Sequence, residues 1–119
     1  MSKQINIVDL LESAIRAESL RQKAISNNIA NIETPNYRRI NVKFEKLLAK
    51  AMESPGSVDI KALEPETYQP KNTPVKPNGN DVNFESEIGH MIKNNLRHEA
   101  YVRLLSKKYR QIELAINLK

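Results

Sequence analysis

The two histidines are the first candidates for metal chemistry in this sequence. His90 and His98 are eight residues apart, whereas helical metal ligands are usually four residues apart. Cysteine is absent, which excludes disulfides and thiolate metal sites. We therefore predict no metal site and no cofactor. We interpret His98 as a residue of a helix–helix contact.

A pair of carboxylates, Glu85 and Glu87, is the nearest candidate for acid–base catalysis. Both follow Asn83 at the expected start of a helix, where negative charge favours the positive end of the helix dipole. The sequence has no glycine-rich phosphate loop and no recognisable nucleophile–base pattern. We assign these carboxylates to the helix terminus, name no catalytic residue and predict that the protein is not an enzyme.

The basic side chains could bind an acidic partner. Lys and Arg number 19 against 14 Asp and Glu, a net charge of +5, and this moderate excess permits binding to nucleic acid. The positive residues are scattered along the chain without a nucleic-acid-reading motif. The run Lys107, Lys108 and Arg110 is interpreted as a solvated face, or as a contact with an acidic neighbouring subunit. A small basic coiled-coil module that binds nucleic acid stays open as an alternative.

An amide-rich stretch, "NNIANIETPNYRR" at residues 27–39, follows a helical apolar pattern. Pro35 disfavours the α conformation at Thr34, so the helix must end by about Glu33. Asn36 tolerates a left-handed conformation and predicts a tight turn. The amides before this turn can donate to, and accept from, either the turn itself or a neighbouring chain.

These side chains must be positioned by a helix that we predict from about Asp9 to Ile32. Asp9 is the expected N-cap, with Glu12 completing a capping-box-like pair. Apolar residues recur with 4-3 spacing along one seam, interrupted by Glu18 and Gln22, and small residues lie beside it. The seam comprises Leu11, Ile15, Ile25, Ile29 and Ile32, and the small residues are Ala14, Ala17 and Ala24. This pattern predicts a face for a partner helix.

A second helix is predicted from Phe84 to about residue 117, with Asn83 as its N-cap. At 1.5 Å per residue it would be about 50 Å long. Its seam also steps by 4 and 3, and only Asn95 and His98 are polar on it. The other positions are Phe84, Ile88, Met91, Val102, Leu105, Tyr109, Ile112 and Ile116.

Proline and glycine separate the two helices. Residues 51–80 hold five of the six prolines and two of the three glycines, which excludes a long helix there. We predict an all-α fold in which the two long helices pair as an antiparallel coiled coil around a Pro-rich irregular loop. We expect three regions: the N-terminal helix and the amide-rich turn at 1–40, an extended or disordered Pro-rich connector at 41–80, and the C-terminal coiled-coil helix at 81–119.

The N-terminal sequence lacks a continuous apolar core. Charged residues interrupt "MSKQINIVDLLESAIRAESL", so we expect no cleaved secretory signal. No stretch approaches the roughly 20 apolar residues of a membrane span.

The amide-rich motif resembles the N-terminal signature of the flagellar rod, hook and hook-associated axial proteins. The matching assembly-motif residues are Asn27, Asn28, Ile29, Ala30, Asn31, Thr34, Pro35, Tyr37 and Arg38. The family usually has glycine where this chain has Asn36, a residue that also tolerates the required backbone conformation. The C-terminal helix, with its "LLSKKY" segment, is similar to that of the proximal-rod members. Together the two similar regions cover about residues 8–40 and 80–117.

This resemblance implies a structural subunit that polymerises through its terminal helices and transmits torque from motor to hook. It implies a place in the periplasmic rod of the basal body and export by the flagellar type III apparatus. The implied partners are further copies of the chain, rod proteins such as FlgC and the FliE adaptor at the rod base. A free homodimeric coiled-coil adaptor is the other alternative.

Overall fold

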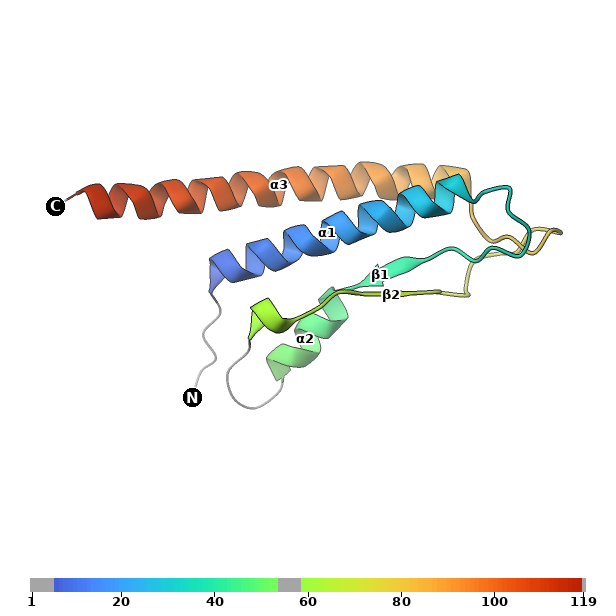
Figure 1. Ribbon diagram of the computed structural model, residues 1–119, viewed down its shortest axis with the longest axis horizontal. Helices are drawn as coiled ribbons and strands as arrows, with labels where there is room; N and C mark the ends of the chain where they lie inside the picture. The colour runs from blue at the N-terminus through green and yellow to red at the C-terminus, as the bar shows by residue number, and fades with distance from the viewer. Residues whose placement is uncertain (1–5, 54–58, 119) are drawn as a thin grey trace.

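The computed structural model describes residues 6–53 and 59–118 and is mostly helical. Figure 1 shows two long helices side by side, with a short helix and two short strands next to the first. The elements in chain order are α1 (Ile7–Ala30), β1 (Asn41–Lys43), α2 (Glu45–Glu53), the 3-10 helix η1 (Ile60–Ala62), β2 (Glu66–Tyr68) and α3 (Phe84–Asn117). The prediction of long N- and C-terminal helices is confirmed.

The helices α1 and α3 run in opposite directions along each other (Figure 1). Asn28 of α1 contacts Glu87 near the start of α3, and Glu18 contacts Asn94 further along. A third contact joins Glu12 to Tyr109. Because positions fall along α1 as they rise along α3, the pair is antiparallel. Coiled-coil packing between the two helices stays a prediction.

The helix ends follow from capping side chains. The N-cap of α1 is Asn6, whose side-chain oxygen accepts from the amides of Val8 and Asp9, so the prediction of Asp9 as the cap is wrong. Asn6 lies three positions earlier, so the helix begins earlier and the capped amides are those of its actual first turn. The predicted cap of α3 is confirmed, since Asn83 Oδ1 accepts from Ser86 N at 2.9 Å.

The segment 41–80 contains more regular structure than the predicted connector. Strands β1 and β2 pair antiparallel, with Val42 opposite Thr67, and β1 lies along the side of α1 that faces away from α3 (Figure 1). Helix α2 follows β1 and ends at Glu53, before Pro55. The prolines of residues 51–80 exclude a long helix there, but α2 is short and ends before the first of them.

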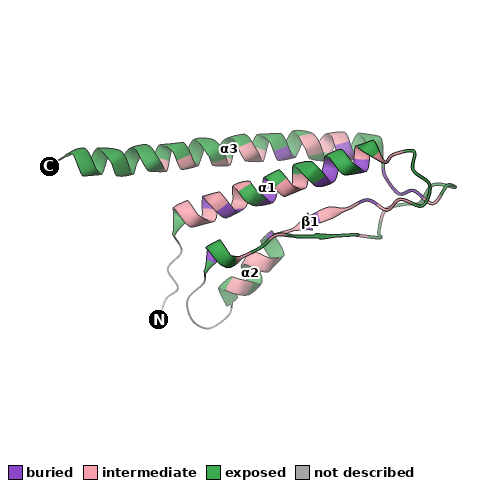
Figure 2. Cartoon of the chain, viewed as in Figure 1, coloured by how far each residue is buried: buried purple, intermediate pink, exposed green. Residues whose placement is uncertain are grey.

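The hydrophobic core is small. Its buried apolar residues come from both ends of the chain and from the middle segment: Leu11, Ala17, Ala24, Ile25, Val42, Phe44, Ile60 and Val82. Buried polar and charged residues are equally numerous, and Figure 2 shows that burial on α3 is concentrated near its start. Since buried charges require partners, the contacts of these polar side chains are central to the fold.

The face that α3 buries within the chain is offset from the predicted apolar seam. Its two fully buried residues are Glu87 and Asn94, and its half-buried positions continue the same 4-3 spacing at Met91, His98, Tyr101, Leu105 and Lys108. The predicted seam shares Met91, His98 and Leu105 with this face. Between residues 88 and 109, its remaining positions lie one residue further along the helix than those of the buried face: Ile88, Asn95, Val102 and Tyr109. Glu87 lies inside because Asn28 of α1 and Arg39 after the turn donate to it, and Asn94 lies inside because it donates to Glu18 of α1.

Candidate functional site

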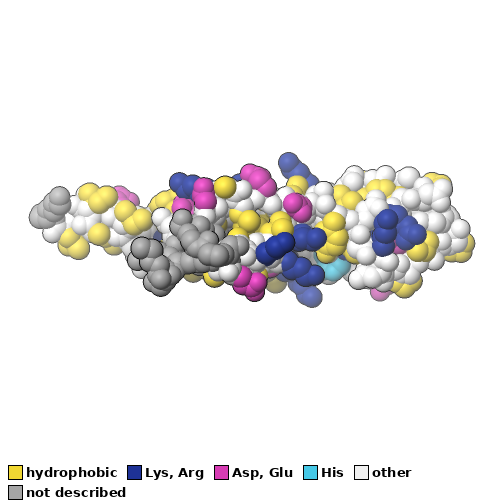
Figure 3. Space-filling model, turned by 90° about the horizontal axis from the view of Figure 1, so that it is seen from below, with side chains coloured by type: hydrophobic (Ala, Val, Ile, Leu, Met, Phe, Trp, Pro, Cys, Tyr) yellow, Lys and Arg dark blue, Asp and Glu magenta, His cyan; other side chains and the backbone are white. Residues whose placement is uncertain are grey.

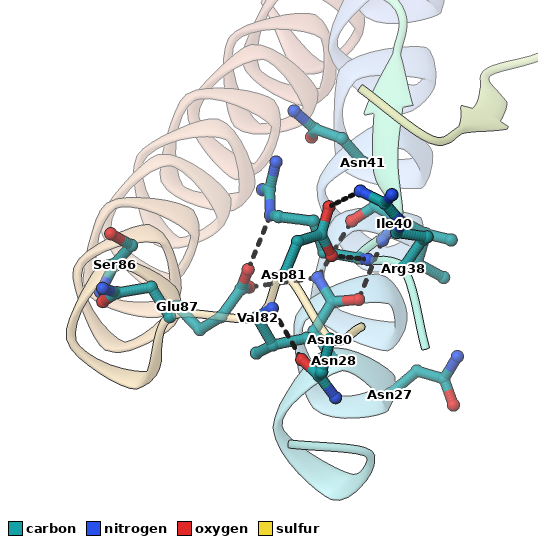
Figure 4. Close-up of polar contacts among 12 residues, drawn as sticks. Asn27, Asn28, Arg38, Ile40, Asn41, Asn80, Asp81, Val82, Ser86 and Glu87 are labelled. Atoms are coloured by element: carbon teal, nitrogen blue, oxygen red, sulfur yellow. Dashed lines mark hydrogen bonds and ion pairs between the residues drawn. The ribbon is translucent and has the colours of Figure 1, made fainter. Parts of the chain in front are cut away.

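Six polar side chains meet where α1 ends and α3 begins. We call them the polar hub: Asn28, Tyr37, Arg39, Asn80, Asp81 and Glu87. All except Tyr37 are buried. Figure 4 shows Glu87 reaching from α3 toward Asn28 of α1, with Asn80 and Asp81 between the helices. The hub therefore joins three segments that are far apart in the sequence.

Asn28 is the central residue of the polar hub and uses its full side-chain amide. Its Nδ2 donates to Ile40 O at 2.9 Å and to Glu87 Oε2 at 3.1 Å. Its Oδ1 accepts from Tyr37 OH and from Ile40 N, both at 2.9 Å. A side-chain amide has two donor hydrogens and two acceptor lone pairs, so Asn28 is saturated.

Buried carboxylates neutralise the arginines of this region. Arg39 Nε donates to Glu87 Oε1 at 3.0 Å, and the Arg39 amide donates to Asp81 Oδ1 at 2.6 Å. The other oxygen of Asp81 has no hydrogen bond and lies 3.7 Å from Arg38 Nη1. These contacts hold the chain after the turn against the start of α3.

A second group of contacts closes the turn itself. Asn80 Nδ2 donates to the carbonyls of Asn31 and Thr34, at 2.8 and 2.9 Å, and so satisfies carbonyls at the end of α1. Asn36 has φ +63°, which confirms the predicted left-handed conformation, and its amide donates to Asn78 O. Gly79 lies close to Asn36, and a Cβ at Gly79 would come within 3.2 Å of Asn36 Cα.

Tyr37 connects the turn to the polar hub. Its hydroxyl donates to Asn28 Oδ1 and accepts from Asn27 Nδ2 at 3.1 Å. Burial raises the pKa of Tyr37, and the negative charges of Glu87 and Asp81 raise this pKa further. The phenol is therefore held in its neutral, hydrogen-bonding form.

A second buried ionic cluster joins the middle of α1 to α3. Glu18, fully buried, accepts from Arg97 Nε at 2.9 Å and from Asn94 Nδ2 at 3.1 Å. Arg21 pairs with Glu18 and also with Glu45 at the start of α2. Burial opposes the charge of both Arg21 and Glu45. The contact between them nevertheless lowers the pKa of Glu45, and the contacts with Glu45 and Glu18 raise the pKa of Arg21. The cluster ties α2 and α3 to α1.

The structure gives the residues of the predicted assembly motif different environments. Asn28 is buried, and Ile29, Asn31, Tyr37 and Arg38 are half-buried. The remaining residues are exposed: Asn27, Ala30, Thr34, Pro35 and Asn36. Asn31 Nδ2 donates to Asn27 O, and Thr34 Oγ1 donates to Asn31 Oδ1. The amides therefore contact the turn within the same chain, and a role of the exposed residues in assembly stays a prediction.

The predicted seam residues divide into two groups by burial. Leu11 and Ile25 are buried, and Ile15, Ile29, Ile88, Met91 and Leu105 are half-buried. Val102, Tyr109, Ile112 and Ile116 are exposed. From residue 109 to 118 every residue of the chain is exposed (Figure 2), and we call this stretch the C-terminal segment. Figure 3 shows hydrophobic side chains spread over this end of α3.

The described residues 6–53 and 59–118 contain no group of three or more His, Asp or Glu side chains that could hold a metal ion. His90 is exposed and His98 is half-buried on the face of α3 toward α1. None of the described helices is long and apolar enough to cross a membrane.

Sequence reasoning missed most of the buried polar partners. From the sequence, Glu87 is assigned to the helix terminus and no role is predicted for Asn80 or Asp81. Glu18 carried a usable signal, because a carboxylate on an otherwise apolar seam requires a buried cation. Arg39 directly follows the motif, but its partner is 48 residues away and no local pattern identifies it.

The sequence of α1 and the turn is similar to a class of structural proteins. Residues 9–38, which contain most of α1 and the turn, match the family model described as flagella basal body rod protein. The chain is therefore similar to components of the flagellar rod in the region that supplies Asn28 and Tyr37 of the polar hub.

Three relatives extend the similarity to nearly the whole chain, and each is named flagellar basal body rod protein FlgB. The protein of Borreliella burgdorferi is 30% identical, covering 92% of this chain and 94% of the relative. Those of Bacillus subtilis and Borrelia hermsii are each 26% identical, covering 98% and 92% of this chain and 97% and 94% of the relatives. The chain belongs to the FlgB family of flagellar basal body rod proteins.

Family membership determines the general function. The chain is a structural subunit of the flagellar basal body rod, and it is not an enzyme. The nucleic-acid-binding and free-adaptor alternatives have no support from these relatives. The relatives are named as rod proteins, and the similarity covers almost their entire length.

Proposed function

We propose that this chain polymerises in the proximal rod of the flagellum, within the periplasm, and transmits torque from motor to hook. The similarity of the C-terminal helix to proximal-rod members supports this position. The observation that carries the polymerisation is the C-terminal segment, where Tyr109, Ile112, Leu114 and Ile116 are all exposed. A row of large apolar side chains on a helix favours burial against another protein surface.

Assembly would complete the coiled-coil seam that the single chain leaves open. Residues Leu11 and Ile25 are already buried, whereas Ile112 and Ile116 are exposed. Neighbouring subunits would cover these positions with their own helices, since a 4-3 apolar seam fits knobs-into-holes packing. The assembly motif would act mainly by fixing the antiparallel return of the chain through the polar hub.

The proposed partners follow from the family resemblance. They are further copies of this chain, other rod proteins such as FlgC, the FliE adaptor at the rod base and the flagellar export apparatus. Export would proceed without a cleaved signal peptide, in agreement with the charged residues that interrupt the N-terminal apolar pattern.

The polymerisation proposal is tested by placing charge on the exposed seam. Ile112→Asp should be secreted but absent from basal bodies, and cells that carry it as their sole copy should be non-motile. Burying an unpaired carboxylate costs several kcal/mol, about 3–5 in well-packed contacts, and the cost recurs at each subunit. Immunoblots of secreted and basal-body fractions measure the two steps separately.

Gln111→Asp is the matched control, because it adds the same charge at the adjacent exposed position of α3. It should enter basal bodies normally. Leu105→Asp is less informative, since Leu105 is half-buried on the face toward α1 and its loss would disturb the subunit itself. Normal rods containing Ile112→Asp would refute burial of this face.

A further inference from the structure

A small cavity beside α1 is lined by an unusual concentration of cationic side chains. It encloses about 80 Å³, and Arg21, Arg39, Arg97 and His90 lie around it, with Ala24 and Ile25 among its apolar walls. Three guanidinium groups at one cavity repel one another unless negative charge is close. The arrangement therefore raises the question of where the compensating charge is.

The carboxylates that compensate Arg39 and Arg97 lie outside the cavity. Glu87 accepts from Arg39 Nε at 3.0 Å, and Glu18 accepts from Arg97 Nε at 2.9 Å. Neither carboxylate lines the cavity, and both are buried. Each guanidinium is thus held by its Nε edge.

The terminal nitrogens of these two arginines remain available. Neither Arg39 nor Arg97 uses Nη1 or Nη2 in a hydrogen bond among the described residues. Solvent reaches these four nitrogens, because the buried side-chain atoms that lack a partner are Asp81 Oδ2 and Asn94 Oδ1 among the described residues. Guanidinium groups fixed in this way present a preorganised pair of donors to an oxyanion.

Arg21 and His90 have different roles at this cavity. Both terminal nitrogens of Arg21 are engaged, by Glu18 and Glu45, so Arg21 contributes mainly charge and shape. His90 is exposed and has no polar partner among the described residues. Its ring adds a further nitrogen at the mouth of the cavity.

The size and chemistry of the cavity point to a single carboxylate. A volume of 80 Å³ corresponds to roughly two or three water molecules, at about 30 Å³ each. The apolar walls suit the methylene groups of a side chain. We propose that this cavity receives the carboxylate of an Asp or Glu side chain from a second copy of the chain in the rod. This inference rests on the proposed polymerisation, which supplies the neighbouring copy.

Self-association of the full chain provides the first test. Sedimentation velocity at constant ionic strength compares Arg97→Gln with Arg103→Gln. Both changes remove one positive charge from α3 that is paired with one glutamate, but Arg103 does not line the cavity. Losing a charge-assisted hydrogen bond should weaken self-association about tenfold or more in Arg97→Gln, and the control should match the wild type.

A second variant separates binding from folding. His90→Glu places a carboxylate at the mouth of the cavity, at an exposed residue that supports no contact of the fold. It should lower self-association as Arg97→Gln does while leaving the circular dichroism spectrum unchanged. Wild-type self-association in both variants would overturn the proposal and leave polymerisation through the C-terminal segment intact.

Inorganic phosphate distinguishes a protein carboxylate from a free oxyanion. In full-length protein labelled with ¹⁵N, phosphate should shift the Nε resonances of Arg39 and Arg97 saturably, and leave Arg103 unchanged. Phosphate should also compete with self-association. Saturable shifts without any effect on self-association would overturn the second copy as the ligand source. Absence of saturable shifts would overturn the oxyanion site itself, even if the wild-type chain did not self-associate.

Discussion

One end of the α1–α3 pair buries polar side chains, and the other end exposes apolar ones. At one end the polar hub encloses charged and amide groups, including Asn28 and Glu87, with almost no exposure. At the other end the C-terminal segment exposes apolar residues such as Ile112 and Ile116, at 48% and 65%. Normal burial preferences are reversed at both ends.

This difference indicates that the polar hub stabilises the fold of the subunit, and it supports the proposed role of the C-terminal segment in assembly. Except for Asp81 Oδ2, the buried side chains of the polar hub find their partners within the chain, so the hub specifies one arrangement of α1, the turn and α3. In the C-terminal segment Tyr109 donates to Glu12, whereas Ile112 and Ile116 are exposed and available to neighbours. Substitutions at the hub should therefore change the subunit, and substitutions in the segment should change the polymer.

The largest effect is expected at Glu87. Glu87→Gln removes the charge that compensates Arg39, and its amide N–H must face either Arg39 Nε or Asn28 Nδ2, both of which require an acceptor. Because the pair is buried, we expect the free energy of unfolding to fall by about 3 kcal/mol. Urea denaturation measures the change.

Glu99→Gln serves as its control, since Glu99 forms an exposed pair with Arg103 on the same helix. Exposed pairs contribute about 0–1 kcal/mol. Equal losses in the two variants would contradict a special role for the polar hub.

The second effect concerns the backbone of the turn. Asn36→Val should lower the free energy of unfolding by about 1–3 kcal/mol, because a β-branched residue is strained at a φ of +63°. Asn36→Gly should remain within a few tenths of a kcal/mol of the wild type, since glycine adopts this conformation freely. Thermal unfolding followed by circular dichroism compares the variants, and a stable Val variant would exclude a strained turn.

The third effect is a dependence on alkaline pH. Burial raises the pKa of Tyr37 in the folded chain, so ionisation favours the unfolded state. Its stabilising contribution is complete below the ordinary tyrosine pKa of about 10 and is lost as pH rises through the folded pKa. Tyr37→Phe should remove this dependence and cost about 1 kcal/mol at neutral pH. Urea unfolding between neutral and alkaline pH tests both statements; an unchanged pH profile in the Phe variant would exclude Tyr37 as the source.

The smallest effect on the single chain is expected in the C-terminal segment. Ile116→Ser should change the free energy of unfolding by less than about 0.5 kcal/mol, as is usual for exposed positions. The same change at buried Ile25 removes a core side chain and should cost at least about 2 kcal/mol. Urea denaturation of the two variants measures the contrast directly. A large loss in Ile116→Ser would show that the segment is packed within the chain.

The helices were predictable because their signals are local. Apolar spacing and the Asn83 cap define α3, and Pro35 with Asn36 defines the turn after α1. The buried face of α3 was missed by one position at Glu87 and Asn94, because apolar content alone does not reveal which polar residues have partners. Those partners lie 59 and 76 residues away, beyond any local pattern.

The sequence predicts an apolar seam along α3, but the structure leaves the C-terminal part of this seam exposed. A 4-3 pattern indicates that a helix face is buried somewhere, but it does not say whether the partner belongs to the same chain. Ile112 and Ile116 continue the pattern of Ile88 and Met91, although α1 begins at Ile7 and, among the described residues, its hydrogen bond furthest along α3 is to Tyr109. The sequence therefore predicts the face and leaves its partner undefined.

The long sequence separation of the helix contacts also has a consequence for synthesis. Glu18 meets Asn94, and Glu12 meets Tyr109, across 76 and 97 residues. Until the ribosome has released nearly the entire polypeptide, α1 has no partner helix and the polar hub lacks Glu87. Because closing so large a loop must precede the favourable contacts, the nascent chain gains its stable form late, after translation is almost complete.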